Sequence, residues 1–137
     1  MAYWILKTEP EAYSWEKLEK EGKASWTGVR NFQARNNLKL MKPGDVALIY
    51  HTGEEKMIVG IAKVVSEPYP DTSAVSGDWV AVDVQAVKPF QRAVSLEEIK
   101  HTHGLSVMPL VSHPRLSVQP VTDAQAQMIL KIAKTEV

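Results

Sequence analysis

Short runs rich in β-branched and aromatic residues, each followed by turn-forming residues, constrain the fold of this chain most strongly. Runs of this kind, bounded by glycine, proline, asparagine or aspartate, are typical of β-strands. The predicted strands cover residues 3–8, 46–50, 57–66, 79–88 and 116–119. Pro89 is expected to end the fourth of them, because proline cannot donate a ladder hydrogen bond. Gly60, inside the third, indicates a bulge or the close approach of another segment.

Four capping signals predict helices between and after these strands. The predicted helices span residues 14–21, 31–40, 95–101 and 122–134. Tyr13 and Leu18 occupy the positions of a hydrophobic staple around the start of the first helix. In the second helix, which Asn31 caps, Phe32 and Leu38 are expected to face a core. Helices at the ends of the strands, rather than alternating with them, favour an α+β fold.

Length and composition set limits on the class of protein. A chain of 137 residues makes one domain of ordinary size, expected over residues 1–137. It has 16 basic and 16 acidic residues, so affinity for nucleic acid would have to come from a local patch. The lack of cysteine excludes disulfides, thiolate catalysis and zinc sites built on cysteine. With no signal-peptide pattern and no apolar run of membrane-spanning length, we expect a soluble, cytoplasmic protein without membrane association.

A basic and aromatic segment at residues 26–37 carries the strongest functional signal. No acidic residue occurs between Glu21 and Asp45. The cations in this interval are Lys23, Arg30, Arg35, Lys39 and Lys42. Trp26 lies on the loop leading into the second helix, whose free N–H groups favour anions. This combination suits a planar, anionic partner, although such a tryptophan is more often a core residue and such a basic run a solvated helix face.

Six blocks of sequence occur in a specific order along the chain. They are YWILKTEP at 3–10, WTGVRN at 26–31, Gly44-Asp45 with Tyr50-His51, VGIA at 59–62, YPD at 69–71 and RLSVQPV at 115–121. Together they resemble the EVE domain, a member of the PUA-like superfamily that is related to the YTH and ASCH domains. The resemblance covers essentially the whole chain. It implies a PUA-like fold, a small, partly open mixed β-barrel of about five or six strands with short flanking helices.

The same resemblance implies a pocket for a modified base. In the related YTH domains an aromatic cage surrounds a methylated base, and the EVE resemblance implies a similar pocket for a modified cytosine in DNA. Trp26 would be one wall and Tyr69 a second, with Trp79 as the competing candidate. Glu9 would approach the base edge, since a carboxylate accepts a hydrogen bond from the cytosine amino group. The implied base pocket comprises Thr8, Glu9, Trp26, Thr27, Asn31, Tyr69, Trp79, Ser117 and Gln119, and the phosphate contacts are Lys7, Arg30, Arg35 and Lys39.

Some of these residues have structural alternatives. Ser117 and Gln119 are equally plausible as hydrogen-bond partners within the fold. Arg30 and Asn31 would either hold a phosphate or position the loop, whereas Arg35 suits contact with backbone charge alone. The roles of these residues therefore depend on where the fold places them.

The predicted function is a nucleic-acid-binding module and not an enzyme, with modified DNA as the favoured partner and a monomer as the favoured state. The alternatives are a PUA-like RNA binder acting on tRNA or rRNA, and an enzyme or nucleotide binder that uses the same cleft. His101, His103 and His113 do not form a metal site by spacing, because positions i and i+2 do not share a helix face. No nucleophile elbow, phosphate-binding glycine loop or zinc-deaminase motif occurs, so we expect no catalytic residue, metal or cofactor.

Overall fold

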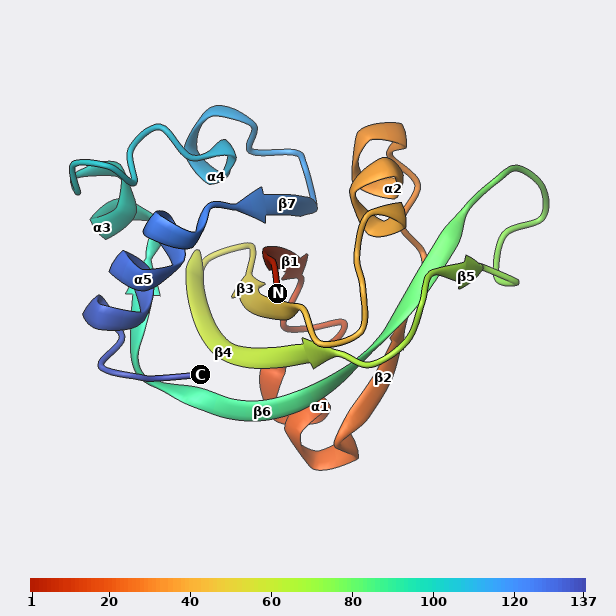
Figure 1. Ribbon diagram of the computed structural model, residues 1–137, viewed down its shortest axis with the longest axis horizontal. Coiled ribbons are helices and arrows are strands. Elements are labelled where there is room, and N and C mark those ends of the chain that lie inside the picture. The colour runs from red at the N-terminus through yellow and green to blue at the C-terminus, as the bar shows by residue number, and fades with distance from the viewer.

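The computed structural model describes all residues from 1 to 137 as a mixed sheet of seven strands with five short helices (Figure 1). The strands are β1 (Tyr3–Thr8), β2 (Lys23–Trp26), β3 (Val46–His51), β4 (Met57–Val64), β5 (Tyr69–Pro70), β6 (Val80–Ser95) and β7 (Val118–Val121). The helices are α1 (Trp15–Glu21), α2 (Phe32–Lys39), α3 (Leu96–Lys100), α4 (Pro109–Ser112) and α5 (Asp123–Ile132). No helix is both long enough and apolar enough to cross a membrane.

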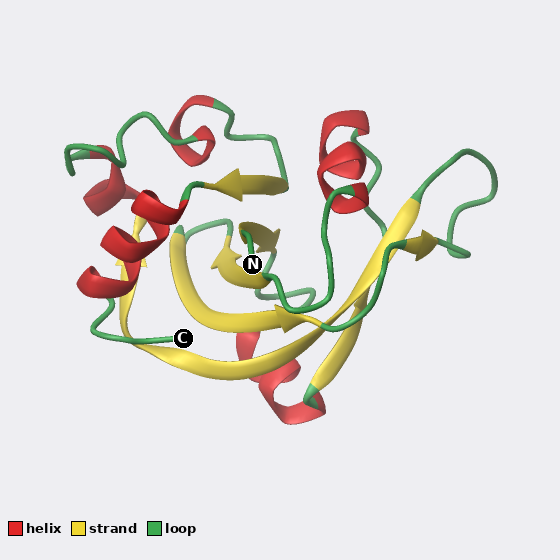
Figure 2. Ribbon diagram, viewed as in Figure 1, coloured by secondary structure: helices red, strands yellow, loops and turns green.

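The strand order is β2-β6-β4-β3-β1-β7, and the two-residue β5 pairs with β6 outside this path. Only β1 and β3 run parallel, whereas all other pairs are antiparallel. No pairing joins β2 to β7, so the sheet curves strongly without closing (Figure 2). The predicted α+β fold with a partly open barrel is therefore confirmed, with seven strands where five or six are expected.

Strands β1 and β3 are buried on both faces because the sheet separates two hydrophobic cores. Tyr3 and Ile5 belong to the core that α3, α4 and α5 cover. Trp4 and Leu6 belong to the core that α1 and α2 cover. Figure 1 shows α3, α4 and α5 grouped together, away from α1 and α2. Since successive side chains of a strand point to opposite faces, burial on both faces explains the continuous apolar sequence of these strands.

Strand β6 continues through Pro89 to Ser95, so the prediction that Pro89 ends the strand is wrong. Pro89 lies opposite Gly60, next to two shifts in the register between β4 and β6. A proline is tolerated at such an irregularity, because the regular ladder hydrogen bond is already interrupted there. The irregularity predicted from Gly60 is confirmed in the pairing of β4 with both of its neighbours.

Several elements differ from the sequence-based expectation. The local patterns do not predict β2, β5 or α4, which are short and depend on pairing or packing with distant segments. Strand β7 begins at Val118, two residues later than expected. The sequence predicts Phe32 in a core, but its side chain is 66% exposed, and the buried residues of α2 are Ala34 and Leu38.

Gly60 lies against the ring of Trp15, which leaves no space for a side chain. A Cβ atom on Gly60 would lie 2.7 Å from three ring carbons of Trp15, a fully buried residue that begins α1. Gly60→Ala should therefore lower the free energy of unfolding by about 1–3 kcal/mol through overpacking, measured by denaturant titration. In a protein that already carries Trp15→Leu, Gly60→Ala should lower the free energy of unfolding by less, because the ring that a Cβ atom would meet is gone. An equal cost in both backgrounds would contradict this steric explanation.

Asp45 connects the start of β1 to the turn that precedes β3. Its Oδ1 accepts a hydrogen bond from the Ala2 amide at 3.0 Å. Its Oδ2 accepts from the Trp4 indole and the Lys42 amide, both at 3.0 Å. Burial alone would raise the pKa of Asp45, but these hydrogen bonds outweigh it and lower the pKa. Asp45 thereby anchors the strand whose far end lines the candidate site.

Candidate nucleic-acid interface

A cavity of about 620 Å³ lies where the ends of β1 and β2 meet the loop that leads into α2. Eight residues of the predicted site line it: Lys7, Thr8, Glu9, Trp26, Thr27, Arg30, Asn31 and Ser117. Six residues outside the prediction also line it: Ala12, Tyr13, Ala24, Ser25, Gly28 and Val29. The fold therefore brings together three separate segments of the chain that the sequence predicts to form one site.

Trp26 is a core residue and a wall of the cavity at the same time. It is the last residue of β2, is only 9% exposed, and packs in the core beneath α1 and α2. Tyr13 meets it edge to face, with ring centroids 6.1 Å apart and an interplanar angle of 86°. Tyr13 Oη donates to Glu21 at 2.6 Å, and burial together with this carboxylate raises the pKa of Tyr13 to about 12. The two rings form an uncharged aromatic corner.

The end of β1 supplies polar groups to the cavity lining. Thr8 Oγ1 donates to the Tyr13 carbonyl at 2.7 Å, so this hydroxyl holds the loop that carries Tyr13. The Glu9 carbonyl accepts from the amides of Ala12 and Tyr13 at 3.0 and 2.8 Å. The carboxylate of Glu9 is exposed and takes part in none of the ion pairs of the fold. It is therefore free to accept hydrogen bonds from a ligand in the cavity.

The loop between β2 and α2 is held by the buried carboxylate of Asp71. Asp71 Oδ2 accepts from the Gly28 amide at 2.8 Å and from Arg30 Nη1 at 3.0 Å, and Oδ1 accepts from the amide and hydroxyl of Ser73. Burial alone would raise the pKa of Asp71, but the hydrogen bonds from Ser73, Gly28 and Arg30 hold it well below its usual range. Gly28 adopts φ 84°, which favours glycine. The Arg30 guanidinium thus positions the loop.

Asn31 and Lys7 line the same cavity from different segments of the chain. The Asn31 side chain accepts from the Ala34 amide at 2.9 Å and caps α2, as the sequence predicts. The start of α2 therefore lies at the cavity rim. The Lys7 ammonium donates to the Pro114 carbonyl at 2.8 Å, and burial lowers the pKa of Lys7. Its remaining N–H groups still provide positive charge beside the cavity.

Five predicted site residues lie outside the cavity, and their contacts explain why. Tyr69 donates its hydroxyl to Asp83, and Gln119 is fully buried with its amide donating to the Leu116 carbonyl at 2.9 Å. Trp79 stacks on Phe32 instead of facing Trp26. The other two residues are Arg35, which hydrogen-bonds to Asn36, and Lys39, which pairs with Asp78. Neither candidate for a second wall takes that position, and Tyr13 fills it.

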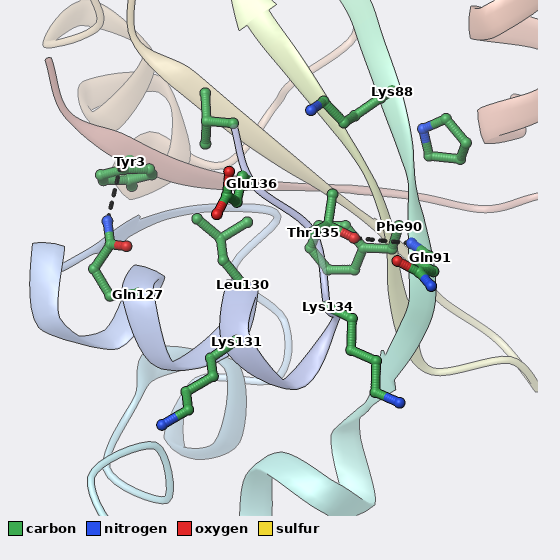
Figure 3. Close-up of a pocket in the computed structure, with 12 residues that line it drawn as sticks. Tyr3, Lys88, Phe90, Gln91, Gln127, Leu130, Lys131, Lys134, Thr135 and Glu136 are labelled. Atoms are coloured by element: carbon green, nitrogen blue, oxygen red, sulfur yellow. Dashed lines mark hydrogen bonds between the residues drawn. The ribbon is translucent and has the colours of Figure 1, made fainter.

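A second hollow, of about 1040 Å³, lies between β6 and the end of α5 and contains none of the predicted residues. Figure 3 shows Lys131 and Lys134 extending away from its centre, with Glu136 beside Leu130. Tyr3 receives a hydrogen bond from Gln127 there at 3.3 Å. The aromatic residues of this hollow, Tyr3 and Phe90, form no ring–ring contact, so the first cavity, which has the Trp26–Tyr13 corner, is the better candidate for base recognition.

Comparisons with known proteins agree with this fold. The family model described as the EVE domain matches residues 2–132. Mouse thymocyte nuclear protein 1 is 38% identical, over 98% of this chain and 74% of that protein. The structure of human THYN1 in complex with 5-methylcytosine-containing DNA superposes with a TM-score of 0.93 at 33% identity and covers all of both chains.

A more distant neighbour shares the fold alone. It is the YTH domain of Zygosaccharomyces rouxii MRB1 in complex with N6-methyladenosine RNA, with a TM-score of 0.64 and 16% identity over 99% of this chain and 88% of that one. This likeness shows that the two chains share a fold. Since the family model spans nearly the whole chain and a relative above 30% identity aligns over almost all of it, this protein belongs to the EVE domain family.

Proposed function

We propose that this protein is a nucleic-acid reader that takes a methylated cytosine of DNA into the cavity walled by Trp26 and Tyr13. The observation that carries this proposal is the aromatic corner beside a free carboxylate, in a cavity of about 620 Å³. That volume lies within the range of about 300–1,000 Å³ that is usual for small-ligand sites. The likeness to human THYN1, whose structure contains 5-methylcytosine DNA, supports the same choice of ligand.

The lining groups match the chemistry of a cytosine ring. Trp26 and Tyr13 offer apolar surface for the base and its methyl group, and the Glu9 carboxylate accepts from the exocyclic amino group. Stacking on an aromatic side chain is worth about 1–3 kcal/mol, and extruding a base from a duplex costs a few kcal/mol. The two terms nearly cancel, so net affinity depends on cationic contacts to the backbone and should fall as salt rises.

We assign the cavity a binding role and no catalytic one. The lining includes the hydroxyls of Thr8, Ser25, Thr27 and Ser117, but no histidine lies among the lining residues to activate them. The Thr8 hydroxyl already donates to the Tyr13 carbonyl. The ionisable groups Arg30 and Lys7 hold loop segments through hydrogen bonds. Because these groups already hold the fold through hydrogen bonds, the cavity suits ligand binding better than acid–base catalysis.

The proposal is tested by titrating the protein with matched short duplexes that carry either cytosine or 5-methylcytosine. A fully buried methyl group is worth about 0.8 kcal/mol, so the methylated duplex should bind about fourfold more tightly. Both affinities should decrease between about 50 and 200 mM salt. Equal affinity for the two duplexes would contradict the proposal. Tighter binding to the matched RNA, lost when its 2′-hydroxyls are removed, would favour an RNA ligand instead.

A further inference from the structure

An aromatic and cationic cluster lies on the surface beside the cavity. It consists of Phe32, Trp79, Arg30 and Arg35, and we name it the Phe32 cluster. The rings of Phe32 and Trp79 stack with centroids 5.2 Å apart and an interplanar angle of 18°. The Arg35 guanidinium lies 5.0 Å from the Phe32 centroid and 5.5 Å from that of Trp79, and Arg30 lies 5.6 Å from Trp79. Two guanidinium groups therefore border one pair of stacked rings.

The Phe32 cluster is supported from within the protein and open to solvent. Trp79 lies against Gly77, where a Cβ atom would come within 2.6 Å of the indole nitrogen. Gly77 also adopts φ 100°, a conformation that side chains rarely accept. Phe32 stacks on this held indole and remains 66% exposed. Single exposed apolar residues are common, but a stacked aromatic pair flanked by arginines offers a specific binding surface.

The cluster is continuous with the rim of the cavity. Asn31 lines the cavity, and Phe32 is the next residue in the chain. Arg30 both lines the cavity and lies near the Trp79 ring. The carboxylate of Asp71 joins the loop before α2 to the segment that leads to Trp79. A nucleic-acid strand with one base in the cavity would thus bring an adjacent nucleotide to Phe32.

The ion pairs in and near the cluster indicate which cationic side chain is available to contact a phosphate. Arg30 is paired with Asp71, and the neighbouring Lys39 is paired with Asp78. Arg35, by contrast, hydrogen-bonds only to the neutral side chain of Asn36, at 3.1 and 3.2 Å. Its positive charge is therefore uncompensated by a direct ion pair and available to a phosphate group.

We infer that the Phe32 cluster is a stacking platform for the nucleotide next to the one held in the cavity, with Phe32 contacting the base and Arg35 the phosphate. This inference rests on the proposed function. Bases stack on aromatic side chains with little dependence on sequence, because every base has a π face. The platform would therefore raise affinity for methylated and unmethylated strands alike, whereas the cavity would select between them.

The test compares Phe32→Ala with wild-type protein in titrations of the same cytosine and 5-methylcytosine duplexes. Loss of one stacked base should weaken both complexes by the same factor, about 5- to 100-fold, and leave the methylation preference intact. Phe32→Tyr, which keeps an aromatic ring, should lose much less affinity than Phe32→Ala. Leu40→Ala, which removes a 65% exposed apolar side chain just after the same helix, should bind as wild type. Arg35→Gln should reduce the dependence of log K on log salt by about one, whereas Phe32→Ala should not change it.

The outcomes separate this inference from the proposed function. If Phe32→Ala binds both duplexes as tightly as wild type, the platform is overturned, while a preference that depends on Trp26 still stands. If Phe32→Ala loses the preference but keeps the affinity for unmethylated duplex, Phe32 acts in base selection and the inference is again wrong. If wild-type protein binds both duplexes equally, the proposed function fails. If Phe32→Ala then still weakens both complexes equally, Phe32 is part of a stacking surface, but the cavity does not select the methylated base.

Discussion

Replacing Trp26 with alanine should abolish the preference for the methylated duplex and weaken its binding about 10- to 100-fold. Trp26 and Tyr13 together form the aromatic corner, and the Tyr13 ring meets the indole edge to face. Without the indole, neither the base nor its methyl group has a matching apolar surface. The measurement is the pair of duplex titrations, with the ratio of the two affinities as the readout.

The Trp26→Ala variant needs a control for folding, because Trp26 also packs in the core. Truncating a buried tryptophan costs about 3–5 kcal/mol, a large part of the stability of a small domain. Thermal unfolding would establish the temperature at which the variant is folded. Trp26→Phe keeps a ring in the core and should retain part of the preference, and Tyr13→Phe, which removes only the hydroxyl bonded to Glu21, should retain all of it. A folded Trp26→Ala protein with an unchanged affinity ratio would contradict the assigned wall.

Replacing Asp71 with alanine should destabilise the protein by about 2–4 kcal/mol at neutral pH and weaken binding to both duplexes. The change removes a buried acceptor of four hydrogen bonds and releases the loop that lines the cavity. Asp71→Asn is the matched variant, because it keeps the size but turns one acceptor into a donor that faces N–H groups. It should also be destabilised. If Asp71→Asn were as stable as wild type, neither the negative charge of Asp71 nor its second acceptor oxygen would be needed for stability.

The contribution of Asp71 to the stability of the folded protein should decrease as the pH falls. Its folded-state pKa lies below the value of about 3.9 for an unfolded aspartate, so ionisation stabilises the folded state. This stabilisation is fully present above the unfolded pKa and is lost as the pH falls through the folded pKa. The difference in unfolding free energy between wild type and Asp71→Ala should therefore shrink from about pH 5 to about pH 2. A difference that grows on acidification would contradict this linkage.

Local sequence signals predict those parts of the fold that depend on local chemistry. The caps at Ser14, Asn31, Ser95 and Thr122 each accept the expected backbone hydrogen bond, because capping involves residues only three positions apart. Strand β2 lacks this kind of signal. Its residues Lys23–Trp26 alternate polar and apolar, but four positions are too few for a local strand signal, and they become a strand by pairing with β6, far along the chain. The extension of β6 past Pro89 likewise depends on its partner β4.

The candidate site also contains residues that the sequence predicts and residues that depend on contacts between distant segments. Trp26, Thr8 and Glu9 are predicted to meet, and they do line one cavity. Tyr13 is missed because its position before a helix cap explains it as a local staple, whereas its contact with Trp26 exists only in three dimensions. Tyr69 and Trp79 do not line the cavity, which the sequence does not reveal because a predicted loop position defines no direction for a side chain. The exposure of Phe32 is missed because Phe32 and Leu38 are six positions apart and do not share a helix face, whereas the buried Ala34 and Leu38 are four apart.

The entry of a methylated cytosine into the cavity is tested most directly by NMR with a duplex that carries a ¹³C-methyl label on 5-methylcytosine. In the complex, the labelled methyl resonance should shift by the ring current of Trp26 and show nuclear Overhauser contacts to the Trp26 or Tyr13 ring protons. The shift should be absent with folded Trp26→Ala. A methyl resonance that stays at its free-duplex position while the protein is saturated would contradict base uptake by this cavity.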